Sequence, residues 1–412
     1  MMNGFTAVPV AKDVFWVGAI DLNVRNFHGY STDRGTTYNA YLILAEKPTL
    51  IDTVKAPFLR EMLNRIASVI NPDRIEYVIS NHSEMDHSGC LPQVMDLVKP
   101  DKVFASVMGR KTLAAHFPFM SSVTAVRDGD RISLGDREVS FMETRMLHWP
   151  DSMFSYLPAE RILFSHDAFG MHLASMERFA DEFDTVVLSY EAKKYFANIL
   201  LPYSNLVTAL LGRVKEAGME FSIIAPDHGP VWRTESDIRR ILGLWETWAH
   251  QKPSCKAVVT YDTMWGSTDL MARAVADGLA SGGITVEVLP LRAFSRSDVA
   301  TALLGAGALI VGSPTLNNGI FPTVADVLAY LKGLRPKNFI GAAFGSYGWS
   351  GEAVGLIERI LGEMDAKPAG DRMRLQYVPD AEGCAKCGEF GEMLAKKISE
   401  LCGRAPSEGG NE

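Results

Sequence analysis

Four side chains that can ligate a metal ion lie within the six residues 82–87. They are His82, Glu84, Asp86 and His87, and they directly follow the apolar run 77–80. This layout predicts a strand that ends in a ligand-bearing loop. Alternate positions of the loop can direct His82, Glu84 and Asp86 at one centre while His87 faces elsewhere. A lone histidine or aspartate after a strand is more often a cap or a surface residue, but capping does not explain four such residues in six positions. The stretch therefore predicts a metal site, with room for two ions side by side.

The glutamate at position 84 indicates which metal is bound. Two-zinc hydrolases with a loop of this shape usually carry His-x-His-x-Asp-His, so Glu84 replaces a histidine with a hard, anionic oxygen ligand. That replacement favours iron or manganese over zinc. Three further candidate ligands follow later in the chain, each after an apolar, strand-like run: His148, Asp167 and His228.

Taken together, these candidates resemble the metallo-β-lactamase superfamily, in which successive strand-end loops of an αββα sandwich supply the ligands and one shared carboxylate bridges both metals. Glu84, combined with the second domain described below, narrows the resemblance to the flavodiiron proteins, and it covers nearly the whole chain. The resemblance implies two irons bridged by Asp167, with His87 turned away and replaced by water. It assigns His82, Glu84 and His148 to one iron, and Asp86, His228 and the bridging Asp167 to the other.

The resemblance also places two residues near the open side of the irons, His28 and Tyr195. An imidazole or a phenol there can hydrogen-bond a bound diatomic molecule, so we take both as candidate catalytic residues. His172 is an intermediate case. The remaining histidines, His116, His166 and His250, are expected to be surface or packing residues.

The composition is that of a globular protein that does not bind nucleic acid. A chain of 412 residues is too long for one ordinary core and suits two or three domains, and 47% hydrophobic with 22% charged residues is a globular composition. The net charge of −8 and the isoelectric point near 5.7 argue against a nucleic-acid binder, which needs a basic surface to neutralise phosphates. Small molecules or protein partners are expected instead.

Cysteine usage and the N-terminus bear on the compartment. The five cysteines are an odd number without the spacing of a disulfide framework, which suits a reducing compartment. No signal peptide and no membrane span is visible, so we expect a cytoplasmic protein. Cys384 and Cys387 form a single C-x-x-C pair, which we interpret as structural because a rubredoxin-type iron site needs two such pairs. The electron donor is then expected to be a separate partner.

The second half of the chain alternates strands with amphipathic helices. A helical, Trp-rich stretch stops at a polar connector around Pro253, and a buried strand begins at Lys256, so we place a domain boundary near residue 252. This alternation predicts a doubly wound parallel sheet. Further strands are expected at 284–289, 308–313, 338–346 and 373–378.

The first of these strands runs into residues 263–268 and then into a helix. Backbone N–H groups and hydroxyls at such a helix start hold phosphate groups. The segment resembles the flavodoxin phosphate loop Thr-x-Thr-Gly-x-Thr, with Trp265 where a hydroxyl is usual. Side-chain contacts are then left to Thr263, Ser267 and Thr268.

Two more loops follow the third and fourth strands of this half. Ligands bind at the carboxyl edge of such sheets, and Tyr347 or Trp349 can stack on a flavin ring. Because no strand is followed by Gly-x-Gly-x-x-Gly, a nicotinamide dinucleotide is not expected, and FMN is. The expected FMN contacts are Thr263, Met264, Trp265, Gly266, Ser267 and Thr268 in the first loop, Ser313, Pro314, Thr315, Leu316, Asn317, Asn318 and Gly319 in the second, and Ser346, Tyr347, Gly348, Trp349, Ser350 and Gly351 in the third.

The fold class that we expect is α/β, with an α+β N-terminal part. Residues 1–251 are assigned to an αββα metallo-β-lactamase-like diiron domain, 252–404 to a flavodoxin-like FMN domain and 405–412 to a disordered tail. Strands of the first domain are expected at 38–45, 49–53, 76–80, 103–106, 139–143 and 221–225.

A carboxylate-rich diiron centre with an open position can bind a small oxidant, and FMN can pass it electrons one at a time, so the pairing indicates a reductase. The resemblance implies reduction of dioxygen to water, of nitric oxide to nitrous oxide, or of both. It also implies a head-to-tail homodimer or a dimer of such dimers, in which FMN of one subunit faces the diiron site of the other. The expected electron donor is a rubredoxin-type protein or a reduced deazaflavin.

Two alternatives compete with this interpretation. A two-zinc hydrolase fused to a flavodoxin is disfavoured by Glu84, because an extra anionic ligand weakens the Lewis acidity that such an enzyme needs. A flavodoxin-type electron carrier with a non-catalytic docking domain is disfavoured by the full set of six ligands. The sequence leaves open which of the two gases is the preferred substrate.

Overall fold

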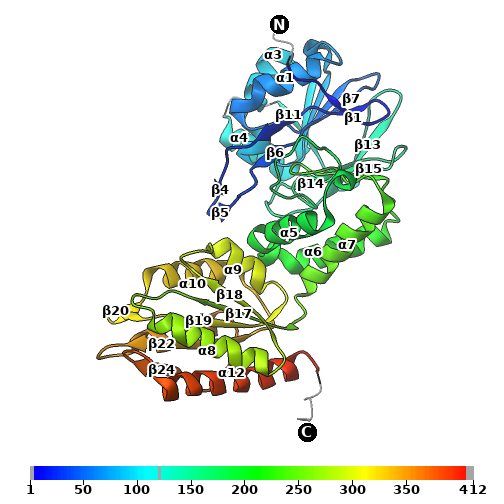
Figure 1. Cartoon of the computed structure of the whole chain (residues 1–412). Helices are drawn as coiled ribbons and strands as arrows, with labels where there is room; N and C mark the ends of the chain where they lie inside the picture. The colour runs from blue at the N-terminus through cyan, green and yellow to red at the C-terminus, as the bar shows by residue number, and fades with distance from the viewer. Residues whose placement is uncertain (1–3, 119–121, 405–412) are drawn as a thin grey trace. The chain divides into compact units, whose positions relative to one another are not determined.

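The computed structural model describes residues 4–118 and 122–404, and the chain forms two compact units (Figure 1). The main segment of the second unit begins at Thr247, inside helix α7 (Glu235–His250), and the boundary expected from the sequence lies near residue 252. The predicted tail, residues 405–412, lies outside the described residues. The first unit contains the chain up to Tyr195 and Tyr203–Glu246, and the second contains Phe196–Pro202 and the chain from Thr247 onward.

Two sheets form the body of the first unit. The pairings from β8 to β11 and from β15 to β16 are parallel, and the other pairings within these two sheets are antiparallel. The seven-stranded sheet has the order β1 (Val8–Ala11), β2 (Val14–Trp16), β7 (Tyr41–Ile43), β8 (Thr49–Ile51), β9 (Tyr77–Ser80), β10 (Lys102–Ser106) and β11 (Val123–Val126). The five-stranded sheet has the order β12 (Arg131–Ser133), β13 (Glu138–Glu143), β14 (Met153–Leu157), β15 (Ile162–Phe164) and β16 (Ile223–Ala225). Two short hairpin-like pairs lie outside the sheets: β3 (Ala19–Asp21) with β6 (Thr36–Tyr38), and β4 (Asn26–Phe27) with β5 (Tyr30–Ser31).

The two sheets share a hydrophobic core, which Trp16 and Ile79 enter from the larger sheet and Phe141 and Phe164 from the smaller one. A second core lies between the larger sheet and helices on its other face. In Figure 1, α5 and α6 lie beside the smaller sheet. This arrangement confirms the predicted αββα sandwich. The helices of this unit are α1 (Leu59–Ala67), α2 (Met85–Ser88), α3 (Leu91–Val98), α4 (Val107–His116), α5 (Thr185–Tyr195), α6 (Ser204–Glu216) and the greater part of α7, with short turns η1 (Ala56–Phe58), η2 (Pro72–Arg74), η3 (Ala180–Glu182) and η5 (Leu201–Tyr203) near them.

One predicted strand, 38–45, is in fact two. The chain leaves the sheet at Asn39, whose N–H donates to the carbonyl oxygen of Asp227 (2.7 Å). The Asn39 amide also donates to the carbonyl oxygens of Pro226 (2.7 Å) and Gly229 (2.9 Å). The hydrogen bonds of one buried residue, Asn39, thus interrupt the strand that the apolar run predicts. They also attach this segment to the loop that carries His228.

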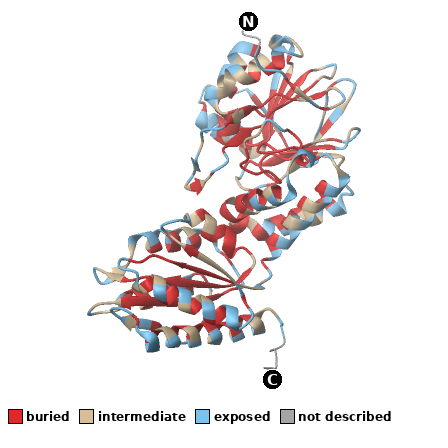
Figure 2. Cartoon of the chain, viewed as in Figure 1, coloured by how far each residue is buried: buried red, intermediate tan, exposed pale blue. Residues whose placement is uncertain are grey.

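The second unit is built on a parallel six-stranded sheet. Every pairing in it is parallel, and in Figure 1 α9 and α10 lie on one face while α8 and α12 lie on the other, as predicted for a doubly wound sheet. Figure 2 shows its central strands buried. The order is β18 (Thr285–Pro290), β17 (Ser254–Tyr261), β19 (Ala306–Gly312), β22 (Ile340–Tyr347) and β23 (Lys367–Pro368), with β24 (Met373–Gln376) also paired to β22 and a separate hairpin of β20 (Thr315–Leu316) and β21 (Gly319–Ile320). The helices are α8 (Ser267–Ser281), α9 (Arg296–Leu303), α10 (Pro322–Leu334), α11 (Glu352–Glu363) and α12 (Ala381–Leu401), with the π-helical turn η4 (Phe196–Leu200).

Among the described residues, no helix has the length and apolar character needed to cross a membrane. Cys387 of α12 is buried in the core of the second unit, Cys384 is half-buried, and both thiols are free.

Glycines allow α8 and α12 to approach closely. A Cβ atom at Gly278 of α8 would overlap with the carbonyl oxygen of Gly388 in α12. We predict that Gly278→Ala lowers the free energy of unfolding of the second unit by about 1–3 kcal/mol, because the helix pair must shift. Gly362→Ala in α11 is the matched control, since the space beside Gly362 is open, and it should stabilise the unit by about 0.5–1 kcal/mol. Scanning calorimetry measures both changes, and an unchanged Gly278→Ala protein would contradict the prediction.

Candidate metal centre and flavin site

The loop after β9 is held in place before any metal is considered. Asp52, which follows β8, accepts hydrogen bonds from the backbone N–H (2.7 Å) and the side-chain amide (2.8 Å) of Asn81. Asp151 accepts from the N–H and the hydroxyl of Ser83, both at 2.6 Å. Buried carboxylates on both sides thus fix the backbone from which His82 and Glu84 extend.

A first group of candidate ligands joins two imidazoles and two carboxylates. Nε2 of His82 lies 3.1 Å from Oε2 of Glu84. Nε2 of His148 lies 3.3 Å from the same oxygen and 2.8 Å from Oδ2 of Asp167. The ligand atoms of these four residues all lie within 4.8 Å of one another, which is close enough for one ion to contact all of them.

A second group lies next to the first and shares Asp167 with it. Nε2 of His228 lies 3.2 Å from Oδ2 of Asp86 and 3.5 Å from Oδ1 of Asp167. Asp167 therefore directs Oδ2 at the first group and Oδ1 at the second. A carboxylate in this position can bridge two metal ions, and the structure brings all six predicted metal ligands to one place.

His87 also faces the second group, so the prediction that it turns away is wrong. Its Nε2 lies 3.1 Å from Oδ1 of Asp167 and 3.4 Å from Oδ2 of Asp86. Because His87 lies in the short helix α2 and not in an extended loop, the alternation of side chains that we assumed does not hold there. A helical geometry brings Asp86 and His87 to the same group.

The outer nitrogens of these imidazoles face buried oxygen atoms. Nδ1 of His228 lies 2.6 Å from the carbonyl oxygen of Thr37, which fixes the proton on Nδ1 and leaves Nε2 free to ligate. Nδ1 of His82 lies 3.5 Å from Asp151, and Nδ1 of His87 lies 3.6 Å from Asp227. Such partners orient a ligating imidazole and raise its basicity, and His87 has the same arrangement as the others.

Several buried polar atoms of the two groups make no hydrogen bond, among them both carboxylate oxygens of Asp86 and Oδ1 of Asp167. Burying an anionic oxygen without a partner is costly, and a metal ion in contact with it removes that cost. Oxygen and imidazole donors suit iron. The residues present therefore fit a pair of iron ions.

The electrostatics agree with a site that attracts positive charge. Burial by itself raises the pKa of Asp167, but the charge of His87 and hydrogen bonds from His148 outweigh burial, so this pKa lies well below its ordinary value. Burial lowers the pKa of His87, yet the carboxylates of Asp86, Asp167 and Asp227 raise it to about 10. The carboxylates dominate the potential at the centre of the site.

Both predicted catalytic residues lie at this centre. Nε2 of His28, in the turn between β4 and β5, lies 2.8 Å from Oε1 of Glu84, and the His28 side chain is 70% exposed. Tyr195, at the end of α5, is buried, and its ring lies 5.1 Å from that of His172. The His172 ring lies 4.7 Å from that of His228, and its Nε2 is buried without a hydrogen-bond partner. His172 therefore belongs to this centre as well.

The other histidines divide between packing and surface positions. His166 is buried, and its ring nitrogens contact the hydroxyl of Thr144 (2.9 Å) and the N–H of Asp167 (2.7 Å). It acts as a support for the bridging residue rather than as a ligand. His116 is exposed, as is His250 at the end of α7.

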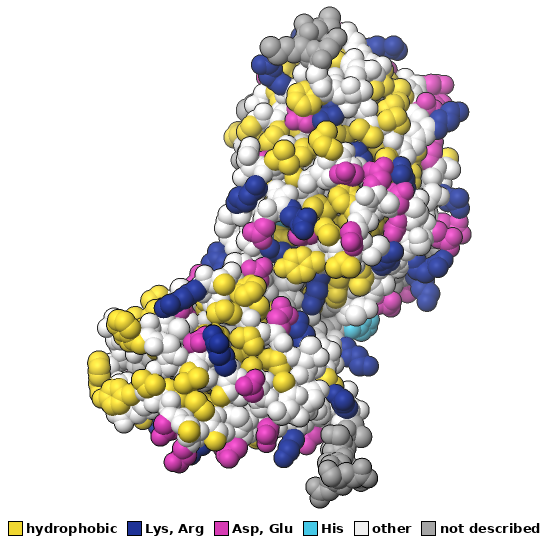
Figure 3. Space-filling model, in the orientation of Figure 1, with side chains coloured by type: hydrophobic (Ala, Val, Ile, Leu, Met, Phe, Trp, Pro, Cys, Tyr) yellow, Lys and Arg dark blue, Asp and Glu magenta, His cyan; other side chains and the backbone are white. Residues whose placement is uncertain are grey.

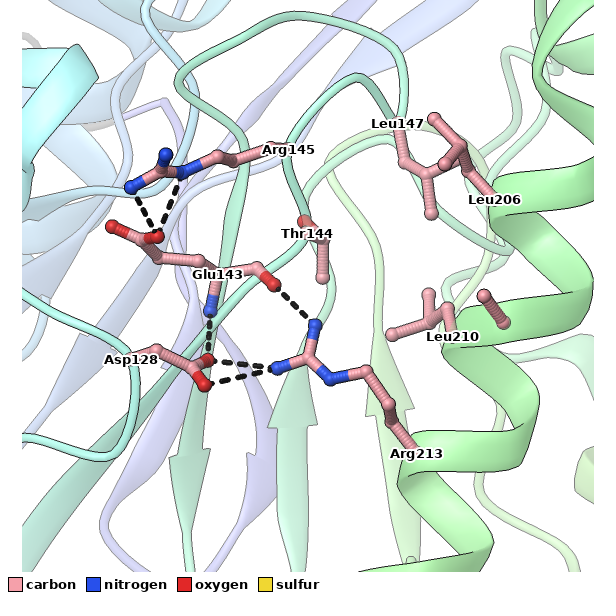
Figure 4. Close-up of a pocket in the computed structure, with 9 residues that line it drawn as sticks. Asp128, Glu143, Thr144, Arg145, Leu147, Leu206, Leu210 and Arg213 are labelled. Carbon is pink, nitrogen blue, oxygen red and sulfur yellow. Dashed lines mark hydrogen bonds and ion pairs between the residues drawn. The ribbon is translucent and has the colours of Figure 1, made fainter.

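A hollow of about 330 Å³ lies beside the loop that carries His148 (Figure 4). Leu147, directly before His148, and leucines of α6 form its apolar side. Arg213 of α6 donates to the carbonyl oxygen of Glu143 (2.9 Å) and pairs with Asp128 (2.9 Å). The charge of Arg213 is therefore paired within the protein. These contacts attach α6 to the segment that leads into the ligand loop.

In the second unit, the three predicted loops meet around a hollow of about 420 Å³. Thr268, Ser313, Gly266, Gly319 and Gly351 belong to the loops but do not line the hollow. One lining residue, Tyr377, was missed, because it follows the short strand β24 and no motif marks it. The lining residues are Thr263, Met264, Trp265, Ser267, Pro314, Thr315, Leu316, Asn317, Asn318, Ser346, Tyr347, Gly348, Trp349, Ser350 and Tyr377.

The first loop has the form of an anion-binding turn. The N–H of Gly266 donates to Oγ1 of Thr263 (3.1 Å), and Gly266 has φ +92°, a conformation that favours glycine. Helix α8 then begins at Ser267, which lines the hollow, so the N-terminus of the helix lies at the hollow's edge. Buried Thr268 is held by a hydrogen bond between its hydroxyl and that of Ser346 (2.9 Å), which joins the first loop to the third.

Large aromatic side chains stand exposed at this hollow. Trp265 is 94% exposed and Trp349 is 88% exposed. Figure 3 shows hydrophobic side chains gathered at the end of this unit where β20 lies in Figure 1. A flat ring system bound there could be covered by these side chains.

Comparison with known proteins agrees with both units. Residues 36–229 match the family model described as ODP family beta lactamase, and residues 259–404 match the model of flavodoxins. A protein of Moorella thermoacetica named nitric oxide reductase is 43% identical over 400 residues, covering 95% of this chain and 99% of that protein. The solved structure of rubredoxin oxygen:oxidoreductase from Desulfovibrio gigas superposes with a TM-score of 0.94 at 41% identity, covering 96% of this chain and 99% of that one. The flavodiiron protein from Giardia intestinalis superposes with a TM-score of 0.93 at 33% identity, covering 98% and 99%.

A beta-lactamase-like unit with a paired set of metal-ligating side chains, continued by a flavodoxin unit, defines a two-domain oxidoreductase. The similarity to these relatives extends over nearly the full length of both chains. The chain belongs to the flavodiiron protein family.

Iron binding by the apoprotein should release protons. The carboxylates raise the pKa of His87 to about 10 and the pKa of His82 well above its ordinary value, both against the effect of burial, so these imidazoles hold protons at neutral pH. An incoming ion must displace them, and affinity should therefore fall as the pH falls. Titration calorimetry in two buffers of different ionisation enthalpy measures the protons released.

The variant His87→Asn tests the corrected position of His87. It should release fewer protons and bind the second equivalent of iron(II) more weakly, with the first equivalent unchanged. His116→Asn, an exposed histidine, is the control. Proton release equal to that of the wild type would contradict the assignment.

Proposed function

We propose that this flavodiiron protein reduces dioxygen to water, nitric oxide to nitrous oxide, or both, at two irons in its first unit, with electrons delivered through FMN in its second. The observation that carries the proposal is the Asp167 carboxylate, which contacts one group of ligands with each oxygen. The relatives named nitric oxide reductase and rubredoxin oxygen:oxidoreductase support the two substrates.

We assign the ligands from these contacts. His87 is an additional donor for the second iron, on the strength of its Nε2 lying 3.1 Å from Asp167 and 3.4 Å from Asp86. When bound, the irons supply an open position for a diatomic oxidant and FMN supplies electrons singly. His82, Glu84 and His148 would hold one iron, Asp86 and His228 would hold the other, and Asp167 would be shared between them.

Two side chains, His28 and Tyr195, can donate protons or hydrogen bonds to the bound oxidant. The hydrogen bond to Glu84 raises the pKa of His28, although burial opposes the shift, so His28 is able to carry a proton at Nε2 while its exposed ring exchanges protons with solvent. Burial, and then the nearby charge of Asp167, raise the pKa of Tyr195 well above its ordinary value, so its phenol keeps its proton and remains a hydrogen-bond donor. Reduction of either gas consumes protons, and these two residues stand where protons are needed.

FMN is held at the three loops of the second unit. Its phosphate would be held at the start of α8 by backbone N–H groups and by the hydroxyls of Thr263 and Ser267. Tyr347, Trp349 or Tyr377 would contact its ring system. These residues would bind and orient the flavin, together with the neighbouring loop at 313–319.

The partners belong to the same proposal. The electron donor is a rubredoxin-type protein or a reduced deazaflavin, and the chain works as a head-to-tail homodimer or a dimer of dimers. Exposed apolar side chains at each site support pairing between copies. They are Trp265 and Trp349 at the flavin hollow, and Met85 (46% exposed) in α2 and Met146 (36% exposed) in the loop before His148. Covering such side chains is a common driving force for association.

Glu84→His should convert the site to the pattern of the two-zinc hydrolases. Changes in residues that merely orient metal ligands cost about 10–100-fold in affinity or activity. Replacing a ligand should therefore lower iron content and the rate of dioxygen and nitric oxide consumption by at least as much. Metal analysis and gas electrodes, with dithionite-reduced protein, measure both quantities.

The control for this substitution is Glu216→His, an exposed glutamate at the end of α6, which should leave iron content and rates unchanged. Full reductase activity of Glu84→His would sink the ligand assignment. Hydrolysis of a thioester or phosphodiester by the wild-type protein, with zinc bound and no response to either gas, would instead support the fused hydrolase.

A further inference from the structure

A buried carboxylate lies directly before the phosphate loop. Asp262 follows the central strand β17 and is 4% exposed. Its Oδ1 accepts a hydrogen bond from the N–H of Thr263 (2.7 Å) and from Nε of Arg292 (3.2 Å). Its Oδ2 accepts from the hydroxyl of Thr323 (2.6 Å). Both carboxylate oxygens are thus fully engaged inside the protein.

Arg292 completes a clamp on one residue of the loop. It lies just beyond β18, and besides its contact with Asp262 it donates through Nη2 to the carbonyl oxygen of Thr263. The backbone of Thr263 is therefore held on its N–H side by Asp262 and on its carbonyl side by Arg292. Since Oγ1 of Thr263 in turn accepts from the N–H of Gly266, fixing Thr263 fixes the turn that leads into α8.

Thr323 connects the same carboxylate to the second loop. It is the second residue of α10, directly after the segment 313–321. That segment is closed by a hydrogen bond from the N–H of Phe321 to Oγ of Ser313 (3.0 Å). Asp262 thereby joins the phosphate loop, the end of β18 and the start of α10 at one edge of the sheet.

The charges around the loop show what Asp262 is suited for. Residues 263–268 contain no lysine or arginine, and a carboxylate directly before a phosphate-binding loop is electrostatically unfavourable for a bound phosphate. Arg292 offsets that charge at 3.2 Å, and a second carboxylate, Asp269, is offset by Arg273 at 3.0 Å. Asp262 is thus placed to hold geometry rather than to attract the ligand.

We propose that Asp262 is a positioning residue for the FMN phosphate. It fixes the backbone of Thr263, both directly and through Arg292, and it links the phosphate loop to α10 through Thr323. This inference rests on the proposed function, since it requires that the loop holds FMN. The loop is organised before the ligand arrives, so its N–H groups need not be ordered on binding.

The test compares FMN with riboflavin, which lacks the phosphate. Each flavin is titrated into flavin-free protein that retains its metals. The quenching of flavin fluorescence measures the binding. Asp262→Asn and Thr323→Val should weaken FMN binding by about tenfold or more, the weight of one hydrogen bond to a charged group, and leave riboflavin binding unchanged. Lys332→Met, at the far end of α10, is the control. It removes an exposed ion pair with Glu363, neither residue lines the hollow, and the variant should leave both affinities unchanged.

Three outcomes separate the two proposals. Equal weakening of FMN and riboflavin in both variants would show a general loss of packing and overturn the positioning role. Unchanged FMN affinity in Asp262→Asn and Thr323→Val, with tight FMN binding by the wild type, would overturn this inference alone. A wild-type protein that binds neither flavin would overturn the flavin part of the proposed function and this inference with it. Should Asp262→Asn fail to fold, Thr323→Val decides the matter, because it removes only the link to α10.

Discussion

The chemistry of this protein depends on one buried carboxylate, Asp167. Its Oδ2 lies 2.8 Å from His148 and its Oδ1 lies 3.1 Å from His87, so one side chain joins two groups of ligands that would otherwise be separate. Burial disfavours the charged form of Asp167, and the protonated imidazoles around it, or metal ions bound by those imidazoles, stabilise that charge. The rest of the first unit can be understood as the structure that keeps this carboxylate ionised and aimed in two directions.

The scaffold achieves this with backbone contacts at strand ends. Asp52 and Asp151 fix the loop after β9, Thr37 orients His228, and His166 supports the N–H of Asp167. Buried polar contacts also fix a loop in the second unit. At the carboxyl edge of its sheet, Asp262 and Arg292 hold the backbone of Thr263. In both units, buried polar residues fix the backbone of the residues that form the site.

The sequence carried most of the information about the site because ligand types at strand ends are local signals. All six predicted metal ligands converge, and so do the three flavin loops, since the carboxyl ends of parallel strands meet at one edge. What failed was orientation. The direction of His87 depends on whether residues 85–88 are extended or helical, and the break in the predicted strand 38–45 depends on the tertiary hydrogen bonds of Asn39. Tyr377 was missed because its place at the hollow is set by tertiary packing and by no motif.

In the function that we propose, the site around Asp167 reduces a gas with electrons that have passed through the flavin. Stopped-flow reoxidation of reduced FMN tests it most directly, with iron-loaded and zinc-loaded samples of the same protein mixed separately with dioxygen and with nitric oxide. We expect rapid reoxidation of the iron-loaded protein by at least one gas and only the slow reaction of a free flavin in the zinc-loaded protein. Equal rates in the two samples would contradict it.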